Sequence, residues 1–300
     1  MRGNTPSVLR TPPPASLREG GLLVRSPNLL GELSEGPRGS VSAVITGTLA
    51  GVPTTWLLPE EVPVAVLINS VSYAVMMATP ADLEDFAIGF ALSEGLVRHW
   101  SHVKHVLAMP SGDGHTVDLA VDESFVVRER MISRSMEGRV GCGLCGIEEL
   151  QDAIRMPQGK VAAVQLDAGA VARAFERLPL YQPMNALNRT VHAAAWCSVD
   201  GSIAMAREDV GRHNALDKLI GAMAREKTKP DGFVLMSSRC SFELVQKCAI
   251  AGIGALATVS APTALAYRLA REAGLKLAAM SNQGVMLFDA SEPGETHGNA

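Results

Sequence analysis

Residues 207–218 read Arg207-Glu-Asp-Val-Gly-Arg-His-Asn-Ala-Leu-Asp-Lys218, a charged turn between an apolar, strand-like segment and one with helical periodicity. The same order of strand, small polar turn and helix returns at Ser237-Ser-Arg-Cys-Ser-Phe-Glu243 and at Val259-Ser-Ala-Pro-Thr263. Strands that alternate with helices predict a layered α/β core with parallel strand pairs. Open α/β sheets bind ligands beyond the carboxyl ends of their strands, so these three turns are expected on one ligand-binding edge.

The pattern extends in both directions from this turn. In the second half we predict strands at 191–198, 202–206, 233–237, 255–259, 276–280 and 285–288, and helices at 168–177, 213–225, 242–251 and 262–273. In the first half we predict strands at 41–49, 62–68, 73–78, 103–109, 116–121 and 125–131, with Asn69-Ser70 as a hairpin turn. A helix over 80–94 is predicted to start with Thr79 as N-cap and Pro80 at its first position.

These elements suggest a division of the chain into five parts. Residues 1–40, rich in proline and glycine, are predicted to be a disordered tail, and 291–300 a second tail. Residues 41–135 are predicted to form a small α+β domain, and 161–290 a layered α/β domain. Between them, 136–160 are predicted to form a mobile cysteine loop followed by a short helix.

Composition excludes several classes of protein. The 300 residues carry 27 basic and 31 acidic side chains, a net charge of −4, which argues against a nucleic-acid binder. No apolar run is long enough to cross a membrane, and no signal peptide is visible. Five cysteines, an odd number, do not form a disulfide scaffold, so we expect a reduced, cytoplasmic chain.

The three turns supply candidate anion ligands. Arg212 can grip a phosphate with its fork of donors at a helix N-terminus, with His213 and His192 as candidate neighbours. Ser238 and Arg239 occupy the equivalent turn after the next predicted strand. A second interpretation is a solvated turn with helix-capping charges, for which Asp209 is well suited; the residues alone leave both open.

Cys142 and Cys145 form the sharpest local feature, a pair of thiols two residues apart in a glycine-rich stretch. A thiol just before a helix N-terminus favours the reactive thiolate. Three interpretations remain open from spacing alone: a redox pair, half of a metal site, and a sulfur carrier on a swinging loop. A zinc site lacks a second pair, because the other three cysteines are scattered, and we interpret them as packed small hydrophobes.

Two further metal patterns are weak. Zinc deaminases need H-x-E followed by P-C-x-x-C, but His192 is followed by two alanines and Cys142 is preceded by Gly141. The three histidines 99, 102 and 105 are interpreted as surface side chains. We therefore predict no metal site.

At this point the chain resembles the formate dehydrogenase accessory sulfurtransferase family (FdhD) over about residues 41–290. The resemblance rests on Cys142-Gly-Leu-Cys-Gly146, His192-Ala-Ala-Ala, the run 207–218, Ser241-Phe-Glu-Leu-Val-Gln-Lys247 and Val259-Ser-Ala-Pro262. The upstream segment 61–96, with Thr79-Pro80 and Gly89-Phe-Ala-Leu-Ser-Glu-Gly95, is similar as well.

The resemblance implies a specific activity, that of a sulfurtransferase. Cys142 would carry a persulfide received from a cysteine desulfurase, with Cys145 as its partner. The sulfur would pass to the molybdenum bis(molybdopterin guanine dinucleotide) cofactor, a bound substrate, before this cofactor enters formate dehydrogenase. The family also implies a homodimer and a cytidine-deaminase-like α/β domain without the zinc chemistry.

The resemblance places the cofactor-binding stretch, including its guanine nucleotide contacts, on Met280, Ser281, Asn282, Gln283, Gly284 and Val285. This stretch departs from the family pattern, which has an aromatic residue and an arginine where this chain has Met280 and Asn282. Either backbone groups hold the nucleotide or its affinity is lower. An alternative function is a chaperone that binds and delivers the cofactor without transferring sulfur.

Overall fold

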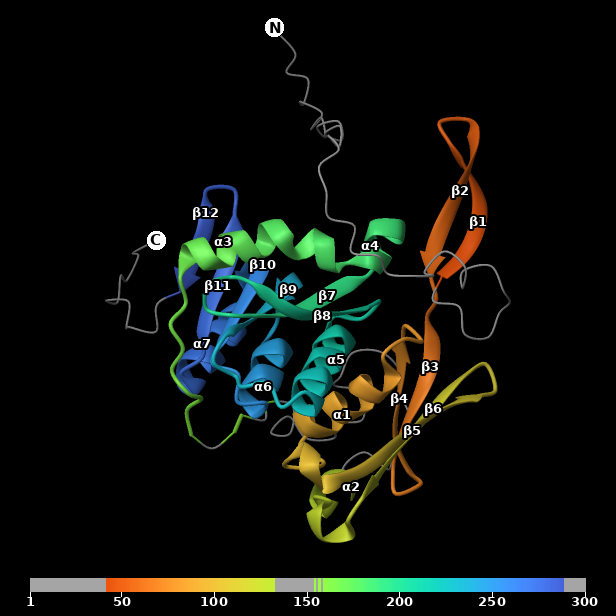
Figure 1. Cartoon of the computed structure of the whole chain (residues 1–300), viewed down its shortest axis with the longest axis vertical. Helices are drawn as coiled ribbons and strands as arrows, with labels where there is room; N and C mark the ends of the chain where they lie inside the picture. The colour runs from red at the N-terminus through yellow and green to blue at the C-terminus, as the bar shows by residue number, and fades with distance from the viewer. Residues whose placement is uncertain (1–41, 133–153, 155, 158, 289–300) are drawn as a thin grey trace, which may run out of the picture. The chain divides into compact units, whose positions relative to one another are not determined.

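The computed structural model describes residues 42–132, 154, 156–157 and 159–288. Its larger sheet has six strands in the order β12-β11-β10-β9-β7-β8 (Figure 1). Their bounds are β7 (His192–Cys197), β8 (Ile203–Asp209), β9 (Phe233–Cys240), β10 (Ala255–Pro262), β11 (Lys276–Ser281) and β12 (Gly284–Phe288). β9, β10 and β11 are parallel, and β7 is antiparallel to both β8 and β9. The carboxyl ends of β8, β9, β10 and β11 therefore share one edge.

Helices cover both faces of this sheet (Figure 1): α3 (Ala168–Arg177) lies on one face, and α5 (Arg212–Arg225), α6 (Phe242–Ile250) and α7 (Ala264–Ala273) on the other. Successive side chains of β9 point to opposite faces of the sheet, as in any strand, and pack against the helices on both sides. Phe233 and Leu235 pack with the α3 side, and Val234 and Met236 with the opposite side. The structure thereby confirms the predicted mixed α/β fold; the likeness to cytidine deaminases stays a prediction.

The first half forms a smaller sheet of four strands in the order β4-β3-β6-β5. These strands are β3 (Val62–Ile68), β4 (Val71–Ala78), β5 (Val103–Ser111) and β6 (Gly114–Val121). The predicted turn between β3 and β4 is confirmed, with φ angles of 50° at Asn69 and 64° at Ser70. Helix α1 (Leu83–Ser93) packs its apolar side chains, among them Phe86 and Phe90, against this sheet.

Helices α1 and α5 touch backbone to backbone, which joins the first half to the second. Gly89 of α1 and Gly221 of α5 are both buried at this contact. A Cβ atom on Gly89 would overlap the carbonyl oxygen of Asp217, and one on Gly221 would overlap that of Asp85. Only a hydrogen atom fits at these two positions, so each glycine is required by the approach of the other helix.

A separate hairpin, β1 (Ser42–Leu49) with β2 (Val52–Pro59), precedes these sheets. The sequence predicts only its first strand, because the prolines near the start and at the end of the second obscure its pattern. Its residues include no charged side chain. Several of its large apolar side chains are exposed, among them Val44, Val52 and Trp56.

The predicted helix 80–94 is correct in place but wrong at its start. α1 begins at Leu83, with Asp82 as an N-cap residue that makes no side-chain capping hydrogen bond. Thr79 does not cap the helix because its polar groups are used elsewhere: its N–H donates to Asp209 and its hydroxyl accepts from the N–H of Val210. Tertiary contacts therefore replace the local capping that the sequence suggests.

The predicted strand 125–131 is also wrong. A 3₁₀ turn, η3 (Glu123–Phe125), and a short helix, α2 (Arg128–Ile132), occupy this segment. Asp122 caps the turn through the N–H of Ser124, and the Phe125 ring stacks on His102 at 3.9 Å between ring centres. The sequence pattern does not predict three short elements: η2 (Trp100–His102), η5 (Leu178–Tyr181) and α4 (Pro183–Asn188).

The predicted tails and the cysteine loop lie outside the described residues, apart from positions at the end of the loop. The division into two folding domains stays a prediction. Among the residues that the structure describes, no helix combines the length and apolar character needed to cross a bilayer.

Candidate functional site

The carboxyl edge of the six-stranded sheet brings together predicted residues from separate segments of the chain. His192 opens β7 and pairs with Asp209, the last residue of β8. Arg212 begins α5 directly after its N-cap residue, Gly211, so only a short turn separates it from the end of β8. Strand pairing therefore places the histidine close to the start of the helix.

The end of β9 adds the second predicted segment to this edge, although residues 238–240 extend the strand instead of forming a turn. Ser238 and Arg239 lie there, on the strand next to β7. The hydroxyl of Ser237 accepts the N–H of Ala193 at 2.8 Å, which fixes β7 and β9 at this point. The predicted grouping of the two turns is therefore correct.

Arg212 is the cation best placed to receive a ligand at this edge. It is the first residue of a 14-residue helix, where free backbone N–H groups attract anions. Its side chain is half-buried and makes no hydrogen bond or ion pair with any residue that the structure describes. An arginine that is partly shielded from water and has no direct ion-pair partner favours a bound anion.

His213 lies beside a residue that the sequence analysis does not single out. Its Nε2 lies 3.2 Å from Oε2 of Glu243 at the start of α6, and both side chains are mostly buried. Burial raises the pKa of Glu243, but its close interaction with His213 and the charge of Arg212 outweigh this effect and lower the pKa. Glu243 therefore stays ionised beside His213, whose buried Nε2 makes no hydrogen bond with the residues that the structure describes.

His192 adds a neutral ring to the same group. Burial lowers its pKa, and the positive charge of Arg212 lowers it further, against the opposing effect of Asp209. At neutral pH the ring is therefore uncharged, with one nitrogen that donates a hydrogen bond and one that accepts. Arg212 supplies the fixed positive charge of the site, and His192 a group that gains charge only in acid.

Ser260 is a second residue at this edge that was not among the predicted ligands. Its Oγ is buried and has no hydrogen-bond partner among the described residues. Ser260 pairs with Arg239 of β9 at a point where the register between β9 and β10 shifts on both sides. Strand irregularities of this kind often re-aim side chains next to ligand sites, so this unpartnered hydroxyl is a candidate donor at the edge.

Other charged residues of the 207–218 run serve the fold. Asp209 does not cap α5; it forms a fully buried ion pair with Lys218, at 2.7 Å. Lys218 also donates to the carbonyl oxygen of Thr79, which ties the end of β4 to α5. Glu208 accepts the N–H groups of Met184 and Asn185 at the start of α4.

Ion pairs and a hydrogen bond also hold α1 against the second half, through Arg207, Arg225 and Asp217. Arg207 donates to Asp85 of α1 at 2.8 Å. Asp217 accepts from Lys247 of α6 at 2.9 Å and from the hydroxyl of Ser93 at 2.7 Å. The run is thus divided: its residues 212 and 213 face the edge, while most of its other charged side chains form buried or half-buried structural contacts.

Some predicted residues are not brought together with Arg212. The segment 280–285 spans the end of β11 and the start of β12, on the same edge but nearer its other end. β11 and β7 are separated by β10 and β9, a distance of about 14 Å at ordinary strand spacing. A ligand that touches both places must therefore be long. Ser281, Asn282 and Gln283 are exposed there.

The cysteines divide into two groups. Cys142 and Cys145 lie outside the described residues. Cys197, Cys240 and Cys248 are buried, and burial raises the pKa of Cys197 and of Cys240 to about 12. The interpretation of these three as packed hydrophobes is confirmed. Within the described part of the chain, no cluster of histidine, cysteine and carboxylate side chains is arranged to hold a metal ion.

Comparison with solved structures supports the fold. The chain matches a crystal structure from Desulfotalea psychrophila, assigned provisionally to a formate dehydrogenase accessory protein, with a TM-score of 0.65. The match covers 82% of this chain and 96% of that one at 21% sequence identity. At this identity the likeness defines a shared α/β fold and nothing further.

Comparison of sequences identifies the family. Residues 59–290 match the family model described as the FdhD/NarQ family. The chain is 47% identical over 247 residues to a sulfur carrier protein FdhD from Chromobacterium violaceum, covering 80% of this chain and 92% of that protein. It is 44% identical over 235 residues to one from Bordetella petrii, covering 78% and 84%. The chain belongs to the FdhD/NarQ family.

Proposed function

We propose that this protein is a sulfur carrier that accepts sulfur as a persulfide on Cys142 and transfers it to the molybdenum bis(molybdopterin guanine dinucleotide) cofactor. The observation that carries the proposal is the half-buried Arg212 at the N-terminus of α5, which has no ion-pair partner among the described residues and lies beside a neutral His192. The names of the relatives, sulfur carrier protein, support the same role.

The loading step needs a donor with a transferable sulfur, for which we propose a cysteine desulfurase. The Cys142 thiolate attacks the outer sulfur of the donor persulfide, and the donor cysteine leaves as a thiolate. One S–S bond forms as another breaks, so no further oxidant is needed. A subsequent attack by the Cys145 thiolate on the inner sulfur of Cys142 would release hydrosulfide and leave a disulfide.

The acceptor step requires the cofactor to lie along the carboxyl edge. Its phosphates fit Arg212 and the free N–H groups of α5, with Arg239 and the hydroxyl of Ser260 farther along the edge. The guanine end would reach residues 280–285, which suits the length of a dinucleotide. We further propose that formate dehydrogenase receives the cofactor and that the carrier acts as a homodimer.

The loading step is tested by intact mass after incubation with a cysteine desulfurase and cysteine. Wild type should gain one sulfur atom, Cys142→Ser none, and Cys145→Ser should still gain it. If wild type gains no sulfur atom, the proposed sulfur carrier function is wrong. If wild type then still binds the cofactor, the alternative function, a chaperone that binds and delivers the cofactor, is favoured.

The binding step is tested separately with guanosine diphosphate. Arg212→Ala should weaken its binding about tenfold or more, the usual cost of losing a charged hydrogen bond. Arg268→Ala removes an exposed arginine of α7 and serves as the control. Equal affinities of wild type and Arg212→Ala would contradict the assignment of this edge to the nucleotide.

A further inference from the structure

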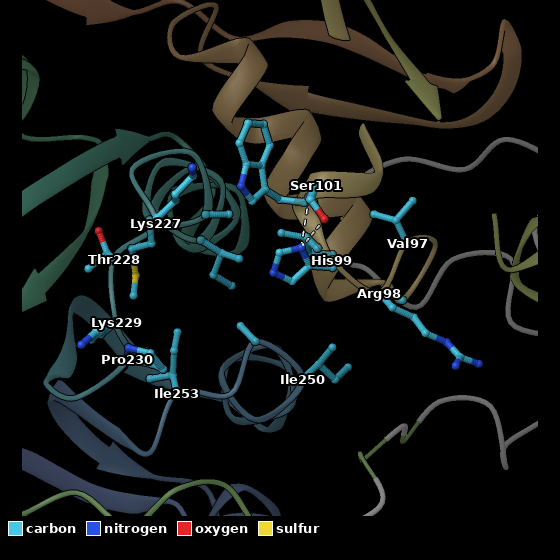
Figure 2. A pocket seen from close by; sticks show the side chains of 17 residues that line it. Val97, Arg98, His99, Ser101, Lys227, Thr228, Lys229, Pro230, Ile250 and Ile253 are labelled. Carbon is cyan, nitrogen blue, oxygen red and sulfur yellow. Dashed lines mark hydrogen bonds between the residues drawn. The ribbon is translucent and has the colours of Figure 1, made fainter. Parts of the chain in front are cut away.

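A cavity of about 840 Å³ lies at the opposite edge of the six-stranded sheet from the candidate site. Figure 2 shows the side chains that line it. It is lined by the end of α1, by η2, by the segment between α5 and β9, and by the segment between α6 and β10. Since two of these segments lead directly into β9 and β10, the cavity faces the amino ends of those strands. Arg212 is separated from it by the length of α5, about 20 Å for 14 residues.

The floor of the cavity is apolar. Leu92, Ile220, Met223, Ile250 and Ile253 contribute aliphatic or thioether side chains, and the half-buried Trp100 adds an aromatic surface. A volume of this size is within the range of about 300–1,000 Å³ found for small-molecule sites. Such sites are mostly apolar with a few convergent polar groups. Several polar side chains line this cavity, and His99 and Lys227 are the candidates for those groups.

His99 is the first polar group. Its Nδ1 accepts the N–H of Ser101 at 3.1 Å. A neutral ring that accepts at Nδ1 carries its proton on Nε2, so Nε2 is a donor. In Figure 2 the His99 ring is directed into the space between the helices, whereas Arg98 points away from it. This Nε2 makes no hydrogen bond with the residues that the structure describes.

Lys227 is the second polar group, and its backbone is unusual. α1, α5 and α6 all end around the cavity with the same pair of hydrogen bonds. Their left-handed cap residues are Gly95 with φ 71°, Lys227 with φ 55° and Gly252 with φ 74°. Glycine adopts this conformation freely, whereas a lysine is strained in it.

The helix dipole offers one explanation for a lysine at this position, because its positive charge compensates the negative carboxyl end of α5. However, α1 and α6 end in the same motif with glycine. Lys227 also makes no ion pair with the described residues. For an exposed lysine the missing ion pair is ordinary, but a strained backbone at the rim of an apolar cavity favours a ligand contact.

We propose that this cavity binds a small organic acid, with its apolar body against Trp100 and the isoleucines and its anionic group between Lys227 and His99. This site is independent of the sulfur carrier activity. It defines a second ligand, chemically different from the long, polar cofactor proposed for the carboxyl edge.

The test uses anilinonaphthalene sulfonate, an aromatic anion, and its uncharged analogue N-phenylnaphthylamine. In fluorescence titrations of the full chain, Lys227→Gly should weaken binding of the sulfonate about tenfold, the usual effect of a charged contact. It should leave binding of the uncharged analogue unchanged. Because glycine relieves the left-handed strain, the melting temperature should stay equal or rise, so loss of folding cannot explain the result.

Two further variants complete the test. Arg189→Gly is the matched control, since Arg189 is an exposed cation with φ 55° at the end of α4 and lies away from the cavity. It should leave binding of both probes unchanged. In His99→Asn the asparagine side chain can still accept the N–H of Ser101, but the Nε2 donor is lost. This variant should weaken binding of the sulfonate. Equal binding of the sulfonate by wild type and Lys227→Gly would overturn the proposal, as would an equal loss of both probes.

Discussion

The Lys218 ammonium group lies 2.7 Å from the Asp209 carboxylate, and neither side chain has any exposed surface. The same ammonium group donates to the carbonyl oxygens of Thr79, at 3.0 Å, and Glu208, at 3.3 Å. Asp209 in turn accepts the N–H of Thr79. One ion pair therefore fixes the end of β8, the first turns of α5 and the end of β4, which together support Arg212.

Removing one partner of this pair should be severe. Lys218→Met fills a similar volume but leaves Asp209 charged, buried and unpaired, which typically costs about 3–5 kcal/mol. Urea denaturation followed by circular dichroism measures this loss. Arg128→Ala breaks the exposed pair with Glu123 and should cost less than about 1 kcal/mol. Similar losses of unfolding free energy in the two variants would show that the buried pair stabilises the protein no more than an exposed pair.

The glycine contact between α1 and α5 predicts an effect of unusual sign. Alanine normally stabilises a helix relative to glycine, by about 1 kcal/mol. Gly221→Ala should instead destabilise the protein by about 1–3 kcal/mol, because its methyl group meets the Asp85 carbonyl oxygen. Gly47→Ala, with open space around it, should be neutral. Thermal denaturation of both variants checks this, and a stabilised Gly221→Ala would contradict the close contact.

Binding of anions should depend on pH through His192. Its lowered pKa means that the free protein holds this ring neutral, whereas a bound anion favours the protonated ring. Pyrophosphate affinity should therefore rise as the pH falls from about 8 to about 6, by at most about tenfold per pH unit for one proton. Isothermal titration calorimetry of wild type and His192→Asn measures the difference. Identical pH profiles would exclude His192 from the site.

The three described cysteines should be inert in the folded protein. Burial raises the pKa of Cys197, Cys240 and Cys248, which removes the reactive thiolate at neutral pH. Brief iodoacetamide treatment followed by peptide mapping should leave them unmodified, and the same treatment in urea should modify all three. Labelling of Cys240 without denaturant would place a reactive thiol at the carboxyl edge.

Much of the second half could be predicted because its layers impose a regular pattern. Strands such as β9 are short apolar runs that end in small polar residues, and the helices between them repeat apolar side chains every three to four positions. The secondary structure of the first half is harder to predict from local sequence. Thr79 and Pro80 have the local signature of a helix start, but Asp209 and Lys218, far along the chain, use the polar groups of Thr79.

The candidate site shows the same limit. Arg212 was recognisable from its position after a glycine at a helix start. Glu243 was visible only as part of a longer motif, and its pairing with His213 depends on how α5 and α6 pack. Ser260 gave no signal beyond a polar residue in a turn, because its lack of a hydrogen-bond partner among the described residues is a property of the folded edge.

The fit between Gly89 and Gly221 also limits how this protein can be recombined with its relatives. A chimera that takes α1 from one parent and α5 from another joins two surfaces that were matched to different partners. Breakpoints between residues 94 and 211 separate these helices and should yield few folded hybrids. Exchanges outside that interval, such as replacement of the β1–β2 hairpin, keep the pair together and should be tolerated.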